Sequence, residues 1–128
     1  GALTGRQAES ALHECHITLN RNSLPFDPNG PWYTSGLRIG TAAVSTLGMG
    51  PAEMEELGSI IALVLKNTAP AADPGNPSDH KGPSKKSRAK YVIDGKAKAQ
   101  ALDRVEKLLS RFPVYPELDL ELLKKLFV

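Results

Sequence analysis

The most regular pattern in the chain is the run Pro51-Ala52-Glu53-Met54-Glu55-Glu56-Leu57-Gly58-Ser59-Ile60-Ile61-Ala62-Leu63-Val64-Leu65-Lys66. Its large apolar residues recur at helical spacing, which predicts one buried face. Proline suits the first position of a helix, and glutamates near the start and a lysine at the end favour the helix dipole. We therefore predict a helix over residues 51–66 that packs against the strands of the domain.

Shorter elements are predicted between the N-terminus and this helix. Thr4 and Gln7 have the spacing of a capping box, so a helix is expected to begin after Thr4. Apolar spacing predicts helices over residues 5–15 and 42–46 and extended segments over residues 17–20 and 33–39. Prolines and glycine in residues 22–32 predict an ordered loop without regular structure.

The composition changes after residue 67. Residues 68–90 are rich in proline, glycine, serine and lysine without an apolar period, which predicts a flexible linker. Apolar spacing predicts two later helices, over residues 102–112 and 119–127. The order of elements predicts an α+β fold in three parts: an α/β core over residues 1–67, a linker over residues 68–90 and a helical tail over residues 91–128.

Composition restricts the classes of protein to which the chain can belong. Its 128 residues suit one modest core, and a net charge of +2 does not favour nucleic acid or an anionic membrane. Cys15 is the only cysteine, so no internal disulfide forms and a cytoplasmic location is expected. The longest apolar stretch, residues 60–65, is too short to span a bilayer. The chain starts at Gly1 without a methionine, so we expect a piece of a longer reading frame.

One short segment predicts an anion site. It reads Thr34-Ser35-Gly36-Leu37-Arg38-Ile39-Gly40-Thr41 and places an arginine between two glycines. Glycine lets a ligand approach the main chain, and a guanidinium matches a carboxylate with two parallel hydrogen bonds. Alone, the segment indicates a carboxylate or phosphate site at Arg38, or a surface ion pair.

Three ordered motifs give the chain a specific resemblance. They are Leu3-Thr4-Gly5-Arg6-Gln7-Ala8-Glu9, Ile17-Thr18-Leu19-Asn20-Arg21-Asn22-Ser23-Leu24-Pro25 and the segment around Arg38. In this order they resemble the C-terminal small domain of serine hydroxymethyltransferase (glycine hydroxymethyltransferase). Lys90-Tyr91-Val92 and Arg111-Phe112-Pro113-Val114-Tyr115-Pro116 look like the tail of its actinobacterial members. Ala42 and Leu47 depart from the proline and the arginine that are usual in the family.

The resemblance implies a fold and an activity. The fold is the small domain of a fold-type I pyridoxal-phosphate transferase, with a short antiparallel sheet covered by helices. The enzyme transfers a one-carbon unit from serine to tetrahydrofolate, which leaves glycine and 5,10-methylenetetrahydrofolate. The arginine of the family's TSG-x-R motif, here Arg38, binds the amino-acid carboxylate, and the asparagine matching Asn22 contacts the folate. The intact enzyme is expected to be a cytoplasmic homodimer.

The resemblance also implies that the catalytic residues lie elsewhere. The family's large pyridoxal-phosphate domain carries the Schiff-base lysine in a T-T-x-H-K run, and this chain has no such run. No catalytic residue is therefore assigned here, and the isolated chain is expected to be inactive. A related aldolase that uses the same carboxylate arginine stays open.

Other sequence features suggest different functions. His13, Cys15 and His16 lie close together, but no suitably spaced fourth ligand exists, so no metal site is assigned. The basic run over residues 81–90 allows a polyanion-binding module, although a charged linker is more often only solvated. A truncated paralogue that acts as a non-catalytic interaction subunit is the remaining alternative.

Overall fold

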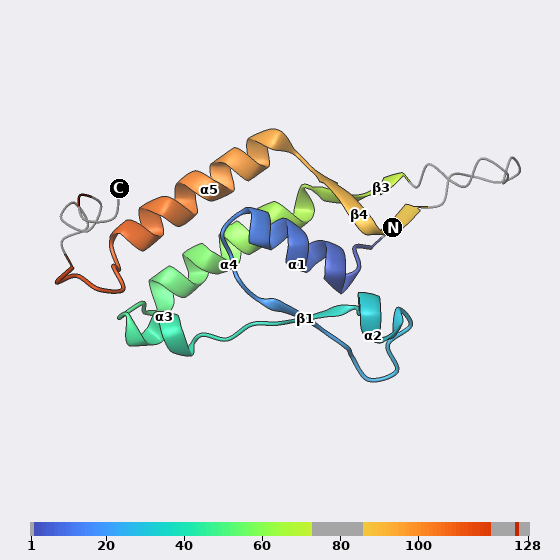
Figure 1. Cartoon of the computed structure of the whole chain (residues 1–128), viewed down its shortest axis with the longest axis horizontal. Coiled ribbons are helices and arrows are strands. Elements are labelled where there is room, and N and C mark those ends of the chain that lie inside the picture. The colour runs from blue at the N-terminus through green and yellow to red at the C-terminus, as the bar shows by residue number, and fades with distance from the viewer. Residues whose placement is uncertain (1, 73–85, 119–124, 126–128) are drawn as a thin grey trace, which may run out of the picture.

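A computed structural model of the chain describes residues 2–72, 86–118 and 125 (Figure 1). The helices are α1 (Gly5–Glu14), α2 (Gly30–Tyr33), α3 (Ala42–Thr46), α4 (Pro51–Lys66) and α5 (Gly95–Ser110). The strands are β1 (Asn20–Asn22), β2 (Gly36–Arg38), β3 (Thr68–Ala72) and β4 (Lys86–Ile93). The predicted α+β class is confirmed, with two separate two-stranded antiparallel sheets. In the described part of the chain, no helix has the length and apolar character needed to cross a membrane.

Helix α4 has the predicted bounds and lies at the centre of the core. It packs against α5 and α1, whereas the strands pack against α1, so the prediction that it is the main packing partner of the strands was wrong (Figure 1). Both strand pairs are short ribbons, and the long apolar faces available to α4 are those of the other two helices. Ile60 and Val64 of α4 are fully buried against residues of α1 and α5, including Leu12 and Val105.

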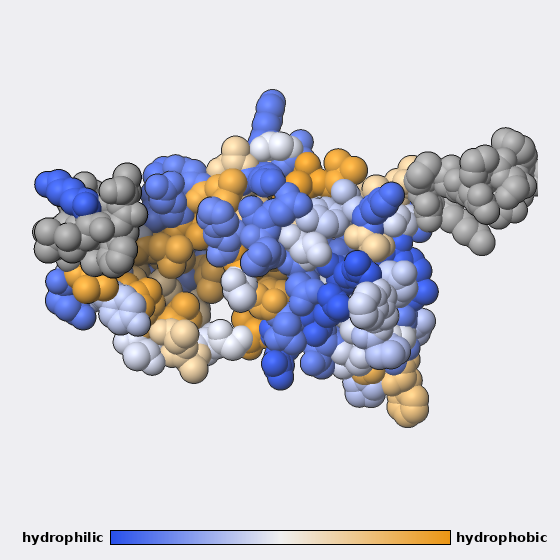
Figure 2. All heavy atoms as spheres, in the orientation of Figure 1, coloured by the Kyte–Doolittle hydropathy of each residue, from blue (hydrophilic) through white to orange (hydrophobic). Residues whose placement is uncertain are grey.

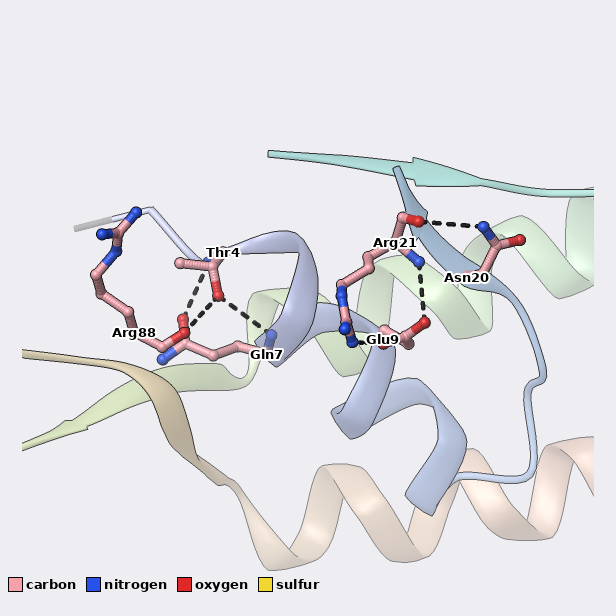
Figure 3. Close-up of polar contacts among 6 residues, drawn as sticks. All are labelled: Thr4, Gln7, Glu9, Asn20, Arg21 and Arg88. Atoms are coloured by element: carbon pink, nitrogen blue, oxygen red, sulfur yellow. Dashed lines mark hydrogen bonds and ion pairs between the residues drawn. The ribbon is translucent and has the colours of Figure 1, made fainter. Parts of the chain in front are cut away.

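Helix α1 begins with the predicted capping box. The Thr4 hydroxyl accepts from the Gln7 backbone, and the Gln7 side chain accepts from the Thr4 backbone. The Gln7 amide also donates to the carbonyl oxygens of Ser87 and Lys90, both at 2.7 Å. The Thr4 hydroxyl donates to the Arg88 carbonyl oxygen at 2.8 Å (Figure 3). The first turn of α1 therefore holds strand β4.

The first strand begins later than predicted. Residues 17–19 were expected to be extended, but β1 covers Asn20–Asn22. Ile17 is buried in the core, and its backbone N–H still donates to the carbonyl oxygen of Leu12 in α1. The chain leaves the helix through His16, which has a left-handed φ of 61°. These residues close the end of α1, so pairing with β2 starts only at Asn20.

The predicted linker has strands at both of its ends, which corrects that part of the prediction. β3 pairs antiparallel with β4, with Thr68 opposite Ile93. Along β4 the residues alternate between exposed and half-buried, a pattern hidden in the sequence by lysines, serine and alanine. Residues 73–85 in the middle of the predicted linker lie outside the described residues.

The predicted helical tail is described in part. Helix α5 starts at Gly95, earlier than the predicted residue 102, because Asp94 caps it by accepting from the Ala97 backbone at 2.9 Å. Ala101 and Val105 share one core with residues of α1 and α4. The predicted helix over residues 119–127 lies outside the described residues except for Lys125. The boundaries of the three predicted parts stay a prediction.

Candidate functional site

Arg38 ends strand β2 and is exposed. Its Nε donates to the Oδ1 of Asn20, the residue opposite it in the ribbon, at 3.2 Å. Among the described residues no carboxylate forms an ion pair with Arg38. The contact with Asn20 orients the guanidinium, and its two terminal nitrogens can donate to an anion.

Asn22 lies on the same face of the ribbon as Arg38. In the antiparallel register Asn20 is opposite Arg38, and Asn22 is opposite Gly36. Opposite residues share a face, and diagonal neighbours on that face are about 7–8 Å apart. Asn22 is exposed and its amide donates to the Ser23 carbonyl oxygen at 2.9 Å. The structure thus brings the two predicted site residues together on one outward face.

The opposite face of the ribbon is fixed to α1. Glu9 accepts from the Arg21 guanidinium at 2.6 Å and from the Arg21 backbone N–H at 3.0 Å (Figure 3). Leu37, opposite Arg21, packs against the main core. Because these contacts hold the inner face, the side chains of Asn22 and Arg38 are directed away from α1.

Asp27 organises the loop that joins the two strands. Its carboxylate accepts from Ser35 Oγ at 2.6 Å and from the backbone N–H groups of Ser35, Asn29 and Leu24 at 2.7, 2.9 and 3.1 Å. The hydrogen bond from the Ser35 hydroxyl is the main reason that the pKa of Asp27 falls to about 2. Sequence reasoning missed this role, although Asp27 followed by Pro28 is a turn signal that could have suggested it.

Thr34 fixes where β2 begins. Its backbone has a left-handed φ of 55°, which is uncommon for a β-branched residue. The Thr34 carbonyl oxygen accepts from the Gly5 N–H at 3.0 Å, and the side chain is buried against α1. A Cβ on Gly5 would lie 2.2 Å from Thr34 Oγ1 and 2.8 Å from the Gly36 carbonyl oxygen. The Thr34-Ser35-Gly36 turn and the start of α1 therefore fit only with glycine at position 5.

The cluster at the end of α1 differs from a metal site. Cys15 is fully buried, and burial raises the pKa of its thiol. His13 and His16 are exposed. Within residues 2–72, 86–118 and 125, no three His, Cys, Asp or Glu residues form a group able to hold a metal ion.

The described lysines do not provide a buried amine. Lys98 is half-buried and the others are exposed. The Lys98 ammonium lies 2.5 Å from Glu14 Oε2, a contact that raises the pKa of Lys98. Glu14 also accepts from the Tyr91 hydroxyl, and the Lys98 and Tyr91 hydrogen bonds lower the pKa of Glu14. A charged lysine held by a carboxylate is poorly suited to nucleophilic attack.

Comparison with known proteins gives the ribbon a context. The family model described as serine hydroxymethyltransferase matches residues 1–61, which include both strands of the ribbon. Serine hydroxymethyltransferase of Treponema pallidum is 52% identical over 91% of this chain and 19% of the relative. The enzyme of that name from Salinispora tropica is 45% identical over 92% of this chain and 23% of the relative.

The chain is homologous to part of serine hydroxymethyltransferase. It spans about a fifth of the length of the curated relatives that it matches. The relative from Chlamydia muridarum is 48% identical over 93% of this chain and 22% of its own length. Since similar identities occur in Treponema and Chlamydia, the expected likeness to actinobacterial members receives no specific support.

Proposed function

We propose that the chain is the substrate-binding C-terminal part of a pyridoxal-phosphate-dependent serine hydroxymethyltransferase. The intact enzyme is proposed to be a cytoplasmic homodimer that converts serine and tetrahydrofolate to glycine and 5,10-methylenetetrahydrofolate. The chain by itself supplies binding groups without the reacting ones, so it is proposed to be inactive in isolation.

The observation that carries this proposal is the exposed and oriented guanidinium of Arg38. Its guanidinium is exposed on a ribbon that Glu9 and Arg21 fix to α1, and Asn20 orients its Nε. A carboxylate can accept two hydrogen bonds from such a group, and a two-point contact fixes the orientation of an amino acid. Serine and glycine both carry the α-carboxylate that this geometry suits.

Asn22 is proposed to bind the folate. An amide both donates and accepts, which suits the edge of a pterin heterocycle. Its place on the same face as Arg38 would bring the one-carbon acceptor near the amino acid. Proximity of this kind is how an enzyme makes transfer between two substrates efficient.

The proposed cofactor is held by residues outside this chain. Pyridoxal phosphate acts as an electron sink when it is bound through a lysine in a pocket that also binds its phosphate. The described lysines are exposed or, for Lys98, paired with a carboxylate, so they do not fit that requirement. Under the proposal, Arg38 only holds the substrate carboxylate, and the large domain supplies the Schiff-base lysine.

The test replaces Arg38 in the intact polypeptide. We expect Arg38→Ala to lower kcat/KM for serine by at least about 100-fold, because removing one partner of a charge pair costs about 3 kcal/mol. Arg38→Lys is not expected to restore it, since an ammonium cannot form the bidentate contact. Steady-state kinetics give kcat/KM, and the absorbance of the bound cofactor checks that pyridoxal phosphate still binds.

Arg111→Ala is the matched control, because Arg111 is an exposed arginine at the end of α5. Its kcat/KM is expected to equal that of the unchanged protein. Wild-type kinetics for Arg38→Lys would contradict the role of Arg38 as carboxylate anchor.

A further inference from the structure

Phe26 is the most exposed large apolar residue that the structure describes. Its relative exposure is 102%, so no part of the ring is covered by the chain. Its backbone has a left-handed φ of 56°, a strained conformation for a bulky residue. Its exposed ring adds no burial energy to offset this backbone strain, and such strain collects at functional positions.

The exposure of Phe26 is built into the loop. The next residue, Asp27, holds the loop through four hydrogen bonds from Leu24, Asn29 and Ser35. Pro25 lies just before Phe26, and its ring restricts the backbone there. The backbone that carries the ring is therefore held in place, and a preorganised segment loses less entropy when it binds a partner.

The surface around Phe26 has the composition of a protein interface. Leu24 is 50% exposed on the same loop, and Trp32, in the helix α2 that follows it, is 61% exposed. The guanidinium groups of Arg6 and Arg21 lie 5.3 and 5.6 Å from the centre of the Trp32 ring. In Figure 1 this loop and α2 project from the body of the chain, and Figure 2 shows apolar atoms at the tip of the projection. Aromatic anchors bordered by arginine are typical of residues that dominate binding energy.

The same surface continues to the proposed substrate face. A Cβ at Gly36 would lie 2.7 Å from Leu24 Cδ2, so Leu24 covers Gly36. Gly36 is directly opposite Asn22 and two residues before Arg38. A partner that binds Phe26 and Leu24 would therefore lie beside Asn22 and Arg38.

We infer that Phe26 is the anchor by which this chain docks into an apolar pocket on the rest of the same polypeptide. The chain spans 19–23% of the length of its relatives, so a homologous full-length protein has about four-fifths of its residues available to form that pocket. This inference rests on the proposed function, because it takes the polypeptide to continue into a large domain. Docking at Phe26 closes the amino-acid and folate face against that domain.

The first experiment measures the exposure of Phe26 without changing it. The intact polypeptide is exposed to hydroxyl radicals in its native and urea-unfolded states, and oxidation of Phe26 is quantified by peptide mass spectrometry. We expect oxidation at least tenfold slower in the native state. Native oxidation as fast as in the unfolded state would overturn the inference. No serine or folate is added, so this result does not depend on the proposed activity.

Dilution shows whether the same polypeptide or a second copy covers Phe26. If the same polypeptide covers Phe26, the ring is expected to stay protected from oxidation when the protein is diluted to monomers. Loss of protection on dilution would mean that a second copy covers Phe26, which would overturn the assigned partner.

A matched pair of variants gives the second measurement. Phe26→Ala is expected to lower the midpoint of thermal unfolding of the intact polypeptide by at least about 3 °C. Val92→Ala, which truncates a side chain 63% exposed on β4, is expected to leave it unchanged. Equal midpoints for Phe26→Ala and the unchanged protein would overturn the anchor role.

Discussion

Asp27 is a single residue on which the shape of the substrate face depends. Its carboxylate accepts hydrogen bonds from both ends of the loop, at Leu24 and at Ser35. Ser35 immediately precedes β2, so the same contacts set where the strand of Arg38 begins. Four donated hydrogen bonds stabilise the charged carboxylate of Asp27 relative to its protonated form.

The contribution of Asp27 to stability depends on pH. The pKa of Asp27 is lowered from 3.8 to about 2, so its contribution to stability is complete above about pH 4 and is lost as the pH falls through about 2. We expect Ser35→Ala to raise this pKa towards its ordinary value, because the Ser35 hydroxyl is the main cause of the shift. Carboxyl-carbon NMR titration measures the midpoint, and Ser110→Ala is the control. An unchanged midpoint in Ser35→Ala would refute the assignment.

A candidate anion site at Arg38 could be proposed from the sequence, whereas the role of Asp27 could not, for a physical reason. A guanidinium between two glycines is a local pattern, readable within eight residues. The role of Asp27 depends on a contact with Ser35, eight positions later, which forms only when Thr34 adopts a left-handed backbone. The candidate roles of Arg38 and Asn22 stay predictions until the kinetic test is made.

Between elements, the close contact of α1 with the start of β2 decides which glycines can be replaced. Gly5 has no room for a side chain, since a Cβ there would approach Thr34 and Gly36. Gly58 is exposed within α4, and a Cβ there would meet nothing within 4 Å. The same substitution should therefore have opposite effects in the two helices.

We expect Gly5→Ala to lower the free energy of unfolding by about 2 kcal/mol, as overpacking does. Gly58→Ala should raise it by about 0.5–1 kcal/mol, because alanine favours helix more than glycine does. Urea denaturation of both variants measures the change. A stabilised Gly5→Ala variant would show that α1 and β2 are not packed as described.

Helices α1, α3 and α4 and the extended segment that contains β2 were predicted from sequence. Helix α2 was missed, because residues 22–32 were predicted to lack regular structure, and strands β3 and β4 were missed as well. The capping box of α1 and the periodicity of α4 each involve residues that are close together in the sequence, within one turn or a few turns of helix. Strand β4 is visible only through its pairing with β3 and its contacts with Gln7. Such pairing joins segments distant in sequence, so local composition predicted a linker instead.

In the whole molecule, Gln7 joins the two halves of the chain. Its fully buried amide donates to two carbonyl oxygens of β4 and accepts from the Thr4 backbone. A glutamate at this position could accept from Thr4 but, when charged, would face the two carbonyl oxygens without a proton to donate.

We therefore expect Gln7→Glu to lower the free energy of unfolding by about 3 kcal/mol at pH 7. Burial raises the pKa of the new carboxyl above its unfolded value, so the loss should shrink as the pH falls below that raised pKa. Gln100→Glu, on an exposed position of α5, is the matched control and should have little effect. Urea denaturation at pH 7 and pH 4 tests this, and an equal loss at both would contradict it.

The contacts of Gln7 also set an order of events during synthesis. The Gln7 side-chain amide donates to carbonyl oxygens of residues that lie 80 and 83 positions later in the chain. A ribosome adds residues from the N-terminus, so α1 leaves it with a polar group that has nothing to bind in the core. The hydrogen bonds of Gln7 can form only after β4 has emerged from the ribosome. Contacts so distant in sequence slow folding. A polypeptide cut before residue 87 would keep the motifs of α1 and β2 but lose the strand that holds the N-terminal helix.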